Sequence, residues 1–295
     1  MAEPSSLAVI RNPNSGTAVD TATIENALNA AGLTAQILDA PHGSDAEAML
    51  DRVAAQHDVV VAAGGDGTVS AVATAVAKAG KTLAIIPSGT LNHFARDTGI
   101  PADLNDAVAI IRNGIERSID VGVVNDRFFL NNVSLGSYPR MVHERDALES
   151  NGRSRTVATA VAIARTWWHL RKLTADLVMD GRRITRRSPF IVVGNGSYVL
   201  SGLSLGKREE ISDGQLSLYV APSTGRIGAL SLPFRALAGR LEAYERFETF
   251  CADRINATFR HRRIETGIDG EVRILESPLR FEIRRAALRM LRPAL

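Results

Sequence analysis

The pattern of hydrophobic and polar residues changes near residue 124. Before that point, short apolar runs alternate with longer stretches whose apolar residues recur at helical spacing. The pattern predicts strands at 7–11, 34–38, 59–63 and 83–86, and helices at 21–31, 45–56, 69–79 and 104–113. Strands that alternate with helices are typical of a parallel sheet covered by helices. The first part of the chain is therefore predicted to be an α/β domain.

Short alternating segments separated by turns make up the rest of the chain. They predict strands at 127–133, 175–179, 190–193 and 216–220, further strands between 247 and 283, and two interrupting helices at 153–173 and 227–240. Alternation with tight turns is typical of antiparallel sheets. We predict two domains, an α/β domain at 1–124, which the segment 284–295 could complete, and a β-sandwich at 125–283. A cleft is expected between them.

Composition narrows the class of protein. The chain has 295 residues, of which 45% are apolar, and one cysteine, Cys251, which excludes an intramolecular disulfide and a cysteine metal cluster. No apolar run reaches membrane-spanning length, and the first residues lack the pattern of a secretory leader. We therefore expect a globular cytoplasmic protein.

Charge is distributed unevenly between the two halves. Residues 1–120 carry a net charge of −7 and residues 121–295 a net charge of +10. This asymmetry fits either a second domain that faces an anionic surface or ligand, or a solvated arginine-rich surface. No pattern indicates nucleic-acid binding.

Three loops carry the candidate chemistry, and each follows a predicted strand. The most informative is Gly64-Gly65-Asp66-Gly67-Thr68, because glycines after a strand let backbone N–H groups approach phosphate and the next helix N-terminus favours an anion. Alone, this loop is equally a tight strand–helix turn. The other two loops are Asn12-Pro13-Asn14-Ser15-Gly16 and the segment 87–96. Since the carboxyl ends of parallel strands share one edge of a sheet, the three loops are predicted to meet there.

The order and spacing of these motifs resemble the diacylglycerol kinase catalytic-domain family, which includes bacterial soluble lipid kinases and the sphingosine and ceramide kinases. The resemblance extends over nearly the whole chain, through Asn132-Val-Ser-Leu-Gly136, Val193-Gly-Asn-Gly196, Ser212-Asp213-Gly214-Gln-Leu216 and Ile268-Asp269-Gly270-Glu271. It implies an α/β ATP-binding domain, a β-sandwich domain and an active site in the cleft between them.

The resemblance also assigns roles to individual residues. It implies that Asp66 binds a catalytic Mg²⁺ or orients the acceptor hydroxyl. It also implies that Glu271 is the general base, with Asp269 beside it as a further catalytic residue. Without the resemblance, the Asp269–Glu271 segment is more simply a hairpin turn. Candidate nucleotide contacts are Asn12, Asn14, Ser15, Gly16, Gly64, Gly65, Gly67, Thr68, Gly89, Thr90 and Asn92.

Several departures from the family pattern limit these assignments. No basic residue follows Gly16, and His93 stands where many members have Asp; we expect no catalytic role for it. Ser212 replaces the first acid of a pair that binds a structural Mg²⁺ in some members. Asp213, with the carbonyls of Gln215 and Leu216, then forms either a remaining Mg²⁺ site or an ordinary turn.

The implied activity is ATP-dependent phosphorylation of a hydroxyl of diacylglycerol or a related lipid, by a protein that contacts the membrane transiently. The basic segment 153–173, which contains Trp167 and Trp168, either lies at the lipid surface or packs on the sandwich. Two other functions stay open, a kinase of a soluble acceptor such as NAD and a non-catalytic nucleotide or lipid sensor. The sequence leaves the oligomeric state open, with a homodimer as one option.

Overall fold

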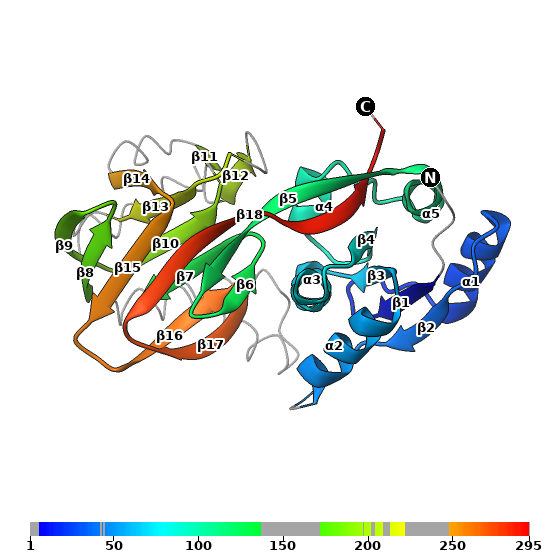
Figure 1. Cartoon of the computed structure of the whole chain (residues 1–295), viewed down its shortest axis with the longest axis horizontal. Helices are drawn as coiled ribbons and strands as arrows, with labels where there is room; N and C mark the ends of the chain where they lie inside the picture. The colour runs from blue at the N-terminus through cyan, green and yellow to red at the C-terminus, as the bar shows by residue number, and fades with distance from the viewer. Residues whose placement is uncertain are drawn as a thin grey trace. The chain divides into compact units, whose positions relative to one another are not determined.

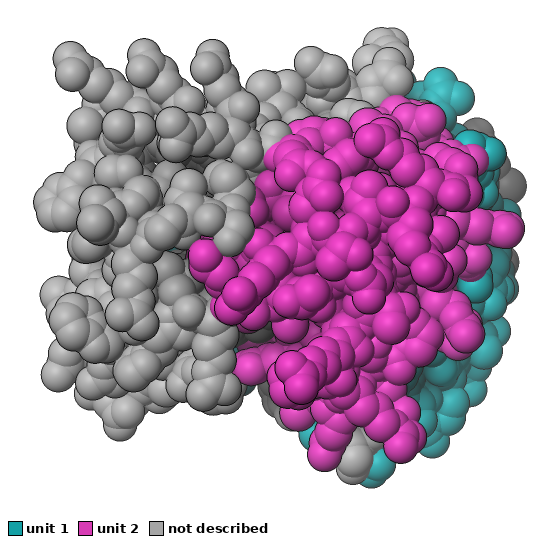
Figure 2. All heavy atoms as spheres, turned by 90° about the vertical axis from the view of Figure 1, so that its left-hand side faces the viewer, with its two compact units in different colours: residues 1–121, 284–295 teal, residues 122–283 magenta. Residues whose placement is uncertain are grey.

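The computed structural model describes residues 6–41, 43, 45–136, 172–196, 198–201, 204–208, 213–221 and 248–294. The chain divides into two compact units, Met1–Val121 with Arg284–Leu295 (unit 1) and Gly122–Ile283 (unit 2), which Figure 1 draws as a ribbon and Figure 2 colours teal and magenta. The predicted helix at 227–240 and residues 153–171 of the other predicted helix lie outside the described residues. Leu173, the expected end of that helix, instead begins a strand.

Unit 1 is built on a parallel sheet. Its strands β1 (Leu7–Arg11), β2 (Gln36–Asp39), β3 (Val59–Gly64) and β4 (Thr82–Pro87) lie in the order β2-β1-β3-β4. All of β3 and β4 is buried, as expected for strands covered on both faces. The helices are α1 (Thr21–Ala30), α2 (Ala46–Gln56), α3 (Asp66–Ala79), α4 (His93–Asp97) and α5 (Leu104–Asn113).

Two long strands each have residues in both units. Strand β5 (Ile115–Val124) pairs with β18 (Leu279–Arg292), and β18 joins the sheet of unit 1 by pairing in parallel with β4 through Arg289 and Met290. The last residues of the chain thus complete the sheet of unit 1. Strand β5 was not among the predicted elements, because only its second half is buried.

Unit 2 consists mainly of antiparallel strands. One sheet has the order β14-β13-β10-β7-β16-β17, from Glu248–Ala252, Leu216–Val220, Phe190–Asn195, Asn132–Gly136, Arg263–Ile268 and Glu271–Glu276. The other strands are β6 (Arg127–Phe129), β8 (Leu173–Met179), β9 (Arg182–Ser188), β11 (Tyr198–Ser201), β12 (Ser204–Arg208) and β15 (Arg254–Phe259).

The core of unit 2 lies between its six-stranded sheet and the neighbouring strands β18, β15, β8 and β9 of the ten-stranded sheet that also contains β1 to β4. Val133 and Val193 from the six-stranded sheet share one buried cluster with Leu177, Ile255 and Phe281 from strands β8, β15 and β18. Two sheets that bury their facing side chains in this way form a β-sandwich. The predicted fold class, an α/β domain followed by a β-sandwich, is therefore confirmed. Among the described residues, no helix has the length and apolar character needed to cross a bilayer.

Candidate functional site

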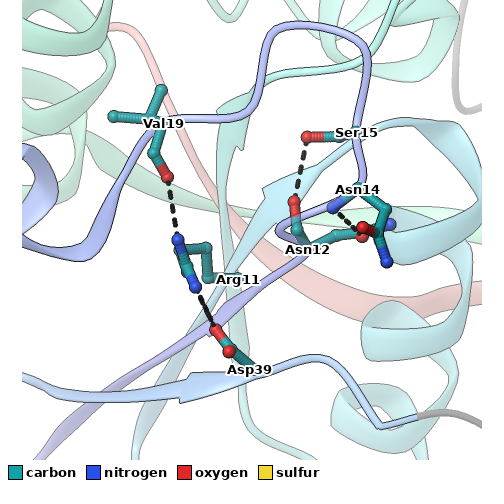
Figure 3. Close-up of polar contacts among 6 residues, drawn as sticks. All are labelled: Arg11, Asn12, Asn14, Ser15, Val19 and Asp39. Carbon is teal, nitrogen blue, oxygen red and sulfur yellow. Dashed lines mark hydrogen bonds and ion pairs between the residues drawn. The ribbon is translucent and has the colours of Figure 1, made fainter.

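The first loop of unit 1 folds back on Asn12, directly after β1. The Asn14 N–H donates to Asn12 Oδ1 (2.9 Å), and Ser15 Oγ donates to the Asn12 carbonyl (3.0 Å), as Figure 3 shows. The strand end before the loop is fixed by Arg11, whose guanidinium donates to Asp39 at 2.6 and 2.8 Å. Asn14 and Ser15 thus shape the loop through contacts close in sequence.

Side chains of this loop also bind the other two loops. Asn12 Nδ2 donates to Thr68 Oγ1 (3.1 Å), and Ser15 Oγ lies 2.9 Å from Ser88 Oγ. The Thr17 N–H donates to the Ser88 carbonyl (3.0 Å). The structure therefore brings the three predicted loops together at the carboxyl ends of neighbouring strands β1, β3 and β4.

Two glycines let the second and third loops approach each other closely. A Cβ on Gly65 would lie 3.2 Å from the Gly89 Cα, and a Cβ on Gly89 would overlap the Gly65 Cα. Because the obstructing atoms belong to the backbone, no side-chain rotation could relieve that overlap. Gly65 and Gly89 are therefore required for the packing of the two loops.

Helix α3 begins inside the second loop without a side-chain cap. Its N-cap is Gly65, which offers no side-chain acceptor, whereas Asp20 and Asp103 cap α1 and α5 with their carboxylates. The first N–H groups of a helix have no partner within the helix, and the helix dipole adds partial positive charge there. The start of α3 can therefore accept an anion such as a phosphate group.

Asp66 links the second loop to the short helix α4. Its Oδ1 accepts the N–H of Phe94 at 3.1 Å. Within the described part of the chain, no hydrogen bond engages the other carboxylate oxygen. A carboxylate oxygen is a ligand atom that Mg²⁺ prefers. Asp66 therefore fits a magnesium ligand whose other oxygen holds the start of α4.

The third loop is closed by the side chain of Asn92. Its Oδ1 accepts the Gly89 N–H (2.9 Å), and its Nδ2 donates to the Gly89 carbonyl (2.8 Å). Asn92 adopts left-handed backbone angles, which Asn tolerates better than most residues. Asn92 therefore fixes the shape of the loop that presents Thr90. His93 lies beside this loop with its Nδ1 2.8 Å from Arg96.

In unit 2, the two carboxylates of the Asp269–Glu271 segment have different environments. Asp269 is buried, and its oxygens accept three consecutive backbone N–H groups, from Leu130 (2.8 Å), Asn131 (2.8 Å) and Asn132 (3.1 Å). Both Asp269 and Gly270 have positive φ angles, and Ile268 pairs with Glu271. The segment is therefore a two-residue hairpin turn between β16 and β17, stabilised by the Asp269 side chain.

Glu271 is exposed at the start of β17. Its Oε2 lies 2.9 Å from a guanidinium nitrogen of Arg273, with half of each side chain exposed. Residues two apart on a strand lie on the same face, so this ion pair follows from the strand geometry. Glu271 is therefore a solvent-accessible, ion-paired carboxylate next to a fixed turn.

The Asp213 turn shows how the candidate structural magnesium site is arranged. Asp213 Oδ1 accepts the Gln215 N–H (3.1 Å), and the Gln215 carbonyl accepts the Gly196 N–H (3.0 Å). Leu216 lies in β13, paired with both Asn195 and Ala252. These contacts are those of an ordinary Asp-centred turn, and a second magnesium site here stays a prediction.

Several contacts of the site were not predicted from the sequence. Ser88 and Phe94 hold the loops of unit 1. Asp269 is held by residues 130–132, the turn from β6 into the first residue of β7, called the turn at 130–132 below. The Arg273 contact could have been found from the strand periodicity. The other contacts join residues far apart in sequence, and no local pattern marks them.

Two family models together match almost the whole chain. Residues 6–124 match the diacylglycerol kinase catalytic domain, and residues 133–292 match the YegS C-terminal NAD kinase beta sandwich-like domain. The second match alone covers more than half of the chain. The boundary between the matches falls where the sequence pattern changes.

Relatives with related names align with parts of the chain. A diacylglycerol kinase of Bacillus subtilis (strain 168) is 37% identical over 109 residues, which are 36% of this chain and 34% of that protein. A diacylglycerol kinase of Staphylococcus epidermidis (strain ATCC 35984) is 31% identical over 147 residues, which are 46% and 45% of the two chains. The matched part of the chain thus spans less than half the length of these relatives.

A solved structure shares the fold over almost its full length. The crystal structure of a diacylglycerol kinase from Bacillus anthracis str. Sterne superposes with a TM-score of 0.70 and 21% identity, covering 99% of this chain and 98% of that chain. At this identity the likeness supports the fold alone. The two domain matches show that the chain belongs to the diacylglycerol kinase catalytic-domain family.

Proposed function

We propose that this protein is an ATP-dependent lipid kinase that transfers the γ-phosphate to a hydroxyl of diacylglycerol or a related lipid. The observation that carries the proposal is the set of three loops joined by the Asn12–Thr68 and Ser15–Ser88 contacts around the uncapped start of α3. The names of the relatives favour a lipid acceptor. The proposed site lies at the membrane surface, which the protein contacts transiently.

Phosphoryl transfer depends chiefly on positioning the reacting groups and on neutralising the charge of the phosphates. Backbone N–H groups at the start of α3 bind the phosphates of ATP, and the rigid Gly89–Asn92 loop bounds the nucleotide on another side. Asp66 is the residue that would hold Mg²⁺, whose role when bound is to neutralise phosphate charge. The remaining residues of the three loops hold the N–H groups and Asp66 in position.

Glu271 is the proposed general base. Its exposed carboxylate accepts the proton of the acceptor hydroxyl as that oxygen attacks the γ-phosphate, and ADP leaves. Asp269 contributes by fixing the turn, because its oxygens are engaged by backbone N–H groups. This division of roles refines the expectation that both carboxylates are catalytic.

The test is transfer of labelled γ-phosphate from ATP with Mg²⁺ to a panel of diacylglycerol, monoacylglycerol, sphingosine, ceramide and phosphatidylglycerol in mixed micelles, with NAD as a soluble acceptor. We expect a labelled lipid, and a loss of about 10²- to 10⁴-fold in kcat for Glu271→Gln. The matched control is Glu276→Gln, at the other end of the same strand, which should transfer normally.

Other outcomes would contradict the proposal in distinct ways. Labelled NAD without labelled lipid would identify a kinase of a soluble acceptor. The second domain match supports this alternative, because its name includes NAD kinase. ATP binding without any transfer would indicate a nucleotide sensor. Equal activity of Glu271→Gln and Glu276→Gln would remove Glu271 from the mechanism.

A further inference from the structure

Asn195 is a buried polar residue of unit 2 that has no role in the proposed reaction. It is the last residue of β10, and none of its surface is exposed. A buried amide is costly to desolvate unless it forms hydrogen bonds. Asn195 Nδ2 donates to the Leu130 carbonyl (3.0 Å), and its backbone N–H donates to the Asn131 carbonyl (2.9 Å). Asn195 therefore binds one short segment twice.

The same segment also binds Asp269. While the carbonyls of Leu130 and Asn131 accept from Asn195, their N–H groups donate to the Asp269 carboxylate, both at 2.8 Å. The Leu130 carbonyl and the Asn131 N–H belong to one peptide group, so that group accepts from Asn195 and donates to Asp269. The Asn131 carbonyl and the Asn132 N–H form a second such group. Hydrogen bonds arranged in series through peptide groups polarise and strengthen one another.

Asp269 transmits this arrangement to the hairpin that carries Glu271. Its own N–H donates to the Asn132 carbonyl (2.9 Å), and its left-handed backbone forms the first position of the turn. Glu271 follows after Gly270 and begins β17. The position of the Glu271 carboxylate therefore depends on a chain of contacts that begins at Asn195.

We propose that Asn195 is a positioning residue for Glu271, acting through the turn at 130–132 and Asp269. This inference rests on the proposed function, in which Glu271 takes the proton of the acceptor hydroxyl. It predicts that losing the Asn195 side chain displaces the base and slows the chemical step. Binding of ATP, which depends on the loops of unit 1, should not change.

Ser188, the last residue of the preceding strand β9, offers a matched control. Ser188 is also fully buried, and its hydroxyl is 2.7 Å from the carbonyls of both Phe190 and Ala221. None of the contacts described for Ser188 reaches the turn at 130–132. Ser188→Ala thus removes a buried side-chain to backbone contact without affecting the proposed path.

The experiment compares kcat, the KM for ATP and the thermal midpoint for the full chain and for Asn195→Ala, Asn195→Thr and Ser188→Ala. Thr keeps nearly the volume of Asn, so Asn195→Thr serves if the alanine variant does not fold. We expect both Asn195 variants to lower kcat by at least about tenfold with an unchanged KM for ATP. Ser188→Ala should lower the thermal midpoint with little change in kcat.

A double-mutant cycle tests the path itself. Asp269→Asn should lower kcat as Asn195→Ala does, and the combined variant should lose little more than the more impaired single variant, because both changes act through the same turn. Additive losses, or an Asn195→Ala variant that loses stability but keeps its kcat, would overturn the inference while leaving the kinase proposal intact. Absence of transfer by the unaltered chain to every acceptor would overturn both.

Discussion

The loops of unit 1 and the acidic hairpin of unit 2 use clustered backbone N–H groups in opposite ways. In unit 1 the loops bind each other through side chains such as Asn12 and Ser15, and the N–H groups at the start of α3 have no capping side chain. In unit 2 the cluster of N–H groups at 130–132 is already filled by the Asp269 carboxylate. One cluster can accept an anionic ligand, and the other contains an anion supplied by the chain.

This difference separates residues that can bind a ligand or substrate from residues that hold the backbone of the site in place. A carboxylate that accepts three N–H groups has little capacity left for chemistry, whereas an exposed carboxylate two residues further on can reach a substrate. The following predictions test whether the distinction is correct.

Within unit 1, the largest effect is expected for Asp66→Ala. Because Asp66 is the proposed magnesium ligand at the phosphates, its loss should lower transfer by about 10²- to 10³-fold. The variant should stay folded and lose about 1 kcal/mol of unfolding free energy, since Asp66 accepts the Phe94 N–H at the start of α4. Transfer of labelled phosphate and chemical denaturation measure the two quantities.

Asp103→Ala is the matched control for that variant. Asp103 caps α5 by accepting the N–H groups of Asn105 and Asp106, so its loss should cost similar stability without loss of transfer. Normal turnover by Asp66→Ala would contradict the proposed site.

A smaller loss is expected for Gly89→Ala. The new Cβ would overlap the Gly65 Cα, and separating the two loops should cost about 1–3 kcal/mol and weaken ATP binding. Gly181→Ala is the control, because alanine at Gly181 strains a backbone with a positive φ angle but its Cβ meets open space, in a hairpin of unit 2. Calorimetric titration with ATP measures the difference; equal affinity of both variants would show that the loop contact is not needed.

How much of the site the sequence could predict depends on the range of each contact. Apolar runs and helix caps are local, so β1, β3, β4 and α5 were predicted to within a residue or two. The three loops were predicted to meet because parallel strands end at one edge. The different environments of Asp269 and Glu271 could not be predicted, because Asp269 binds a turn more than 130 residues earlier in the chain.

Within the hairpin, Asp269→Asn and Glu271→Gln should distinguish the residue that stabilises the turn from the residue proposed to contact the substrate. Replacing one carboxylate oxygen of Asp269 by an amide leaves buried N–H groups without an acceptor, which should lower the unfolding free energy by about 1–3 kcal/mol. Glu271→Gln should leave stability nearly unchanged, because its ion pair with Arg273 is exposed. Chemical denaturation measures both, and a larger destabilisation by Glu271→Gln would reverse the assigned roles.

The smallest expected effect concerns Asp20, which precedes α1 on the far side of the first loop. The pKa of Asp20 is lowered, chiefly by the hydrogen bond from the Thr23 hydroxyl and then by the Thr23 N–H. A carboxyl whose pKa is lower in the folded state stabilises the fold above its ordinary value of 3.8, and this contribution disappears as the pH falls through the folded value. Asp20→Asn keeps a capping oxygen but does not titrate, so its thermal midpoint should lie below that of the unaltered chain at neutral pH and approach it in acid. A gap that stays constant across that range would show that the Asp20 charge does not contribute. Because the cap is exposed and lies outside the contacts that join the three loops, transfer should be unaffected at neutral pH, unlike the loss expected for Asp66→Ala.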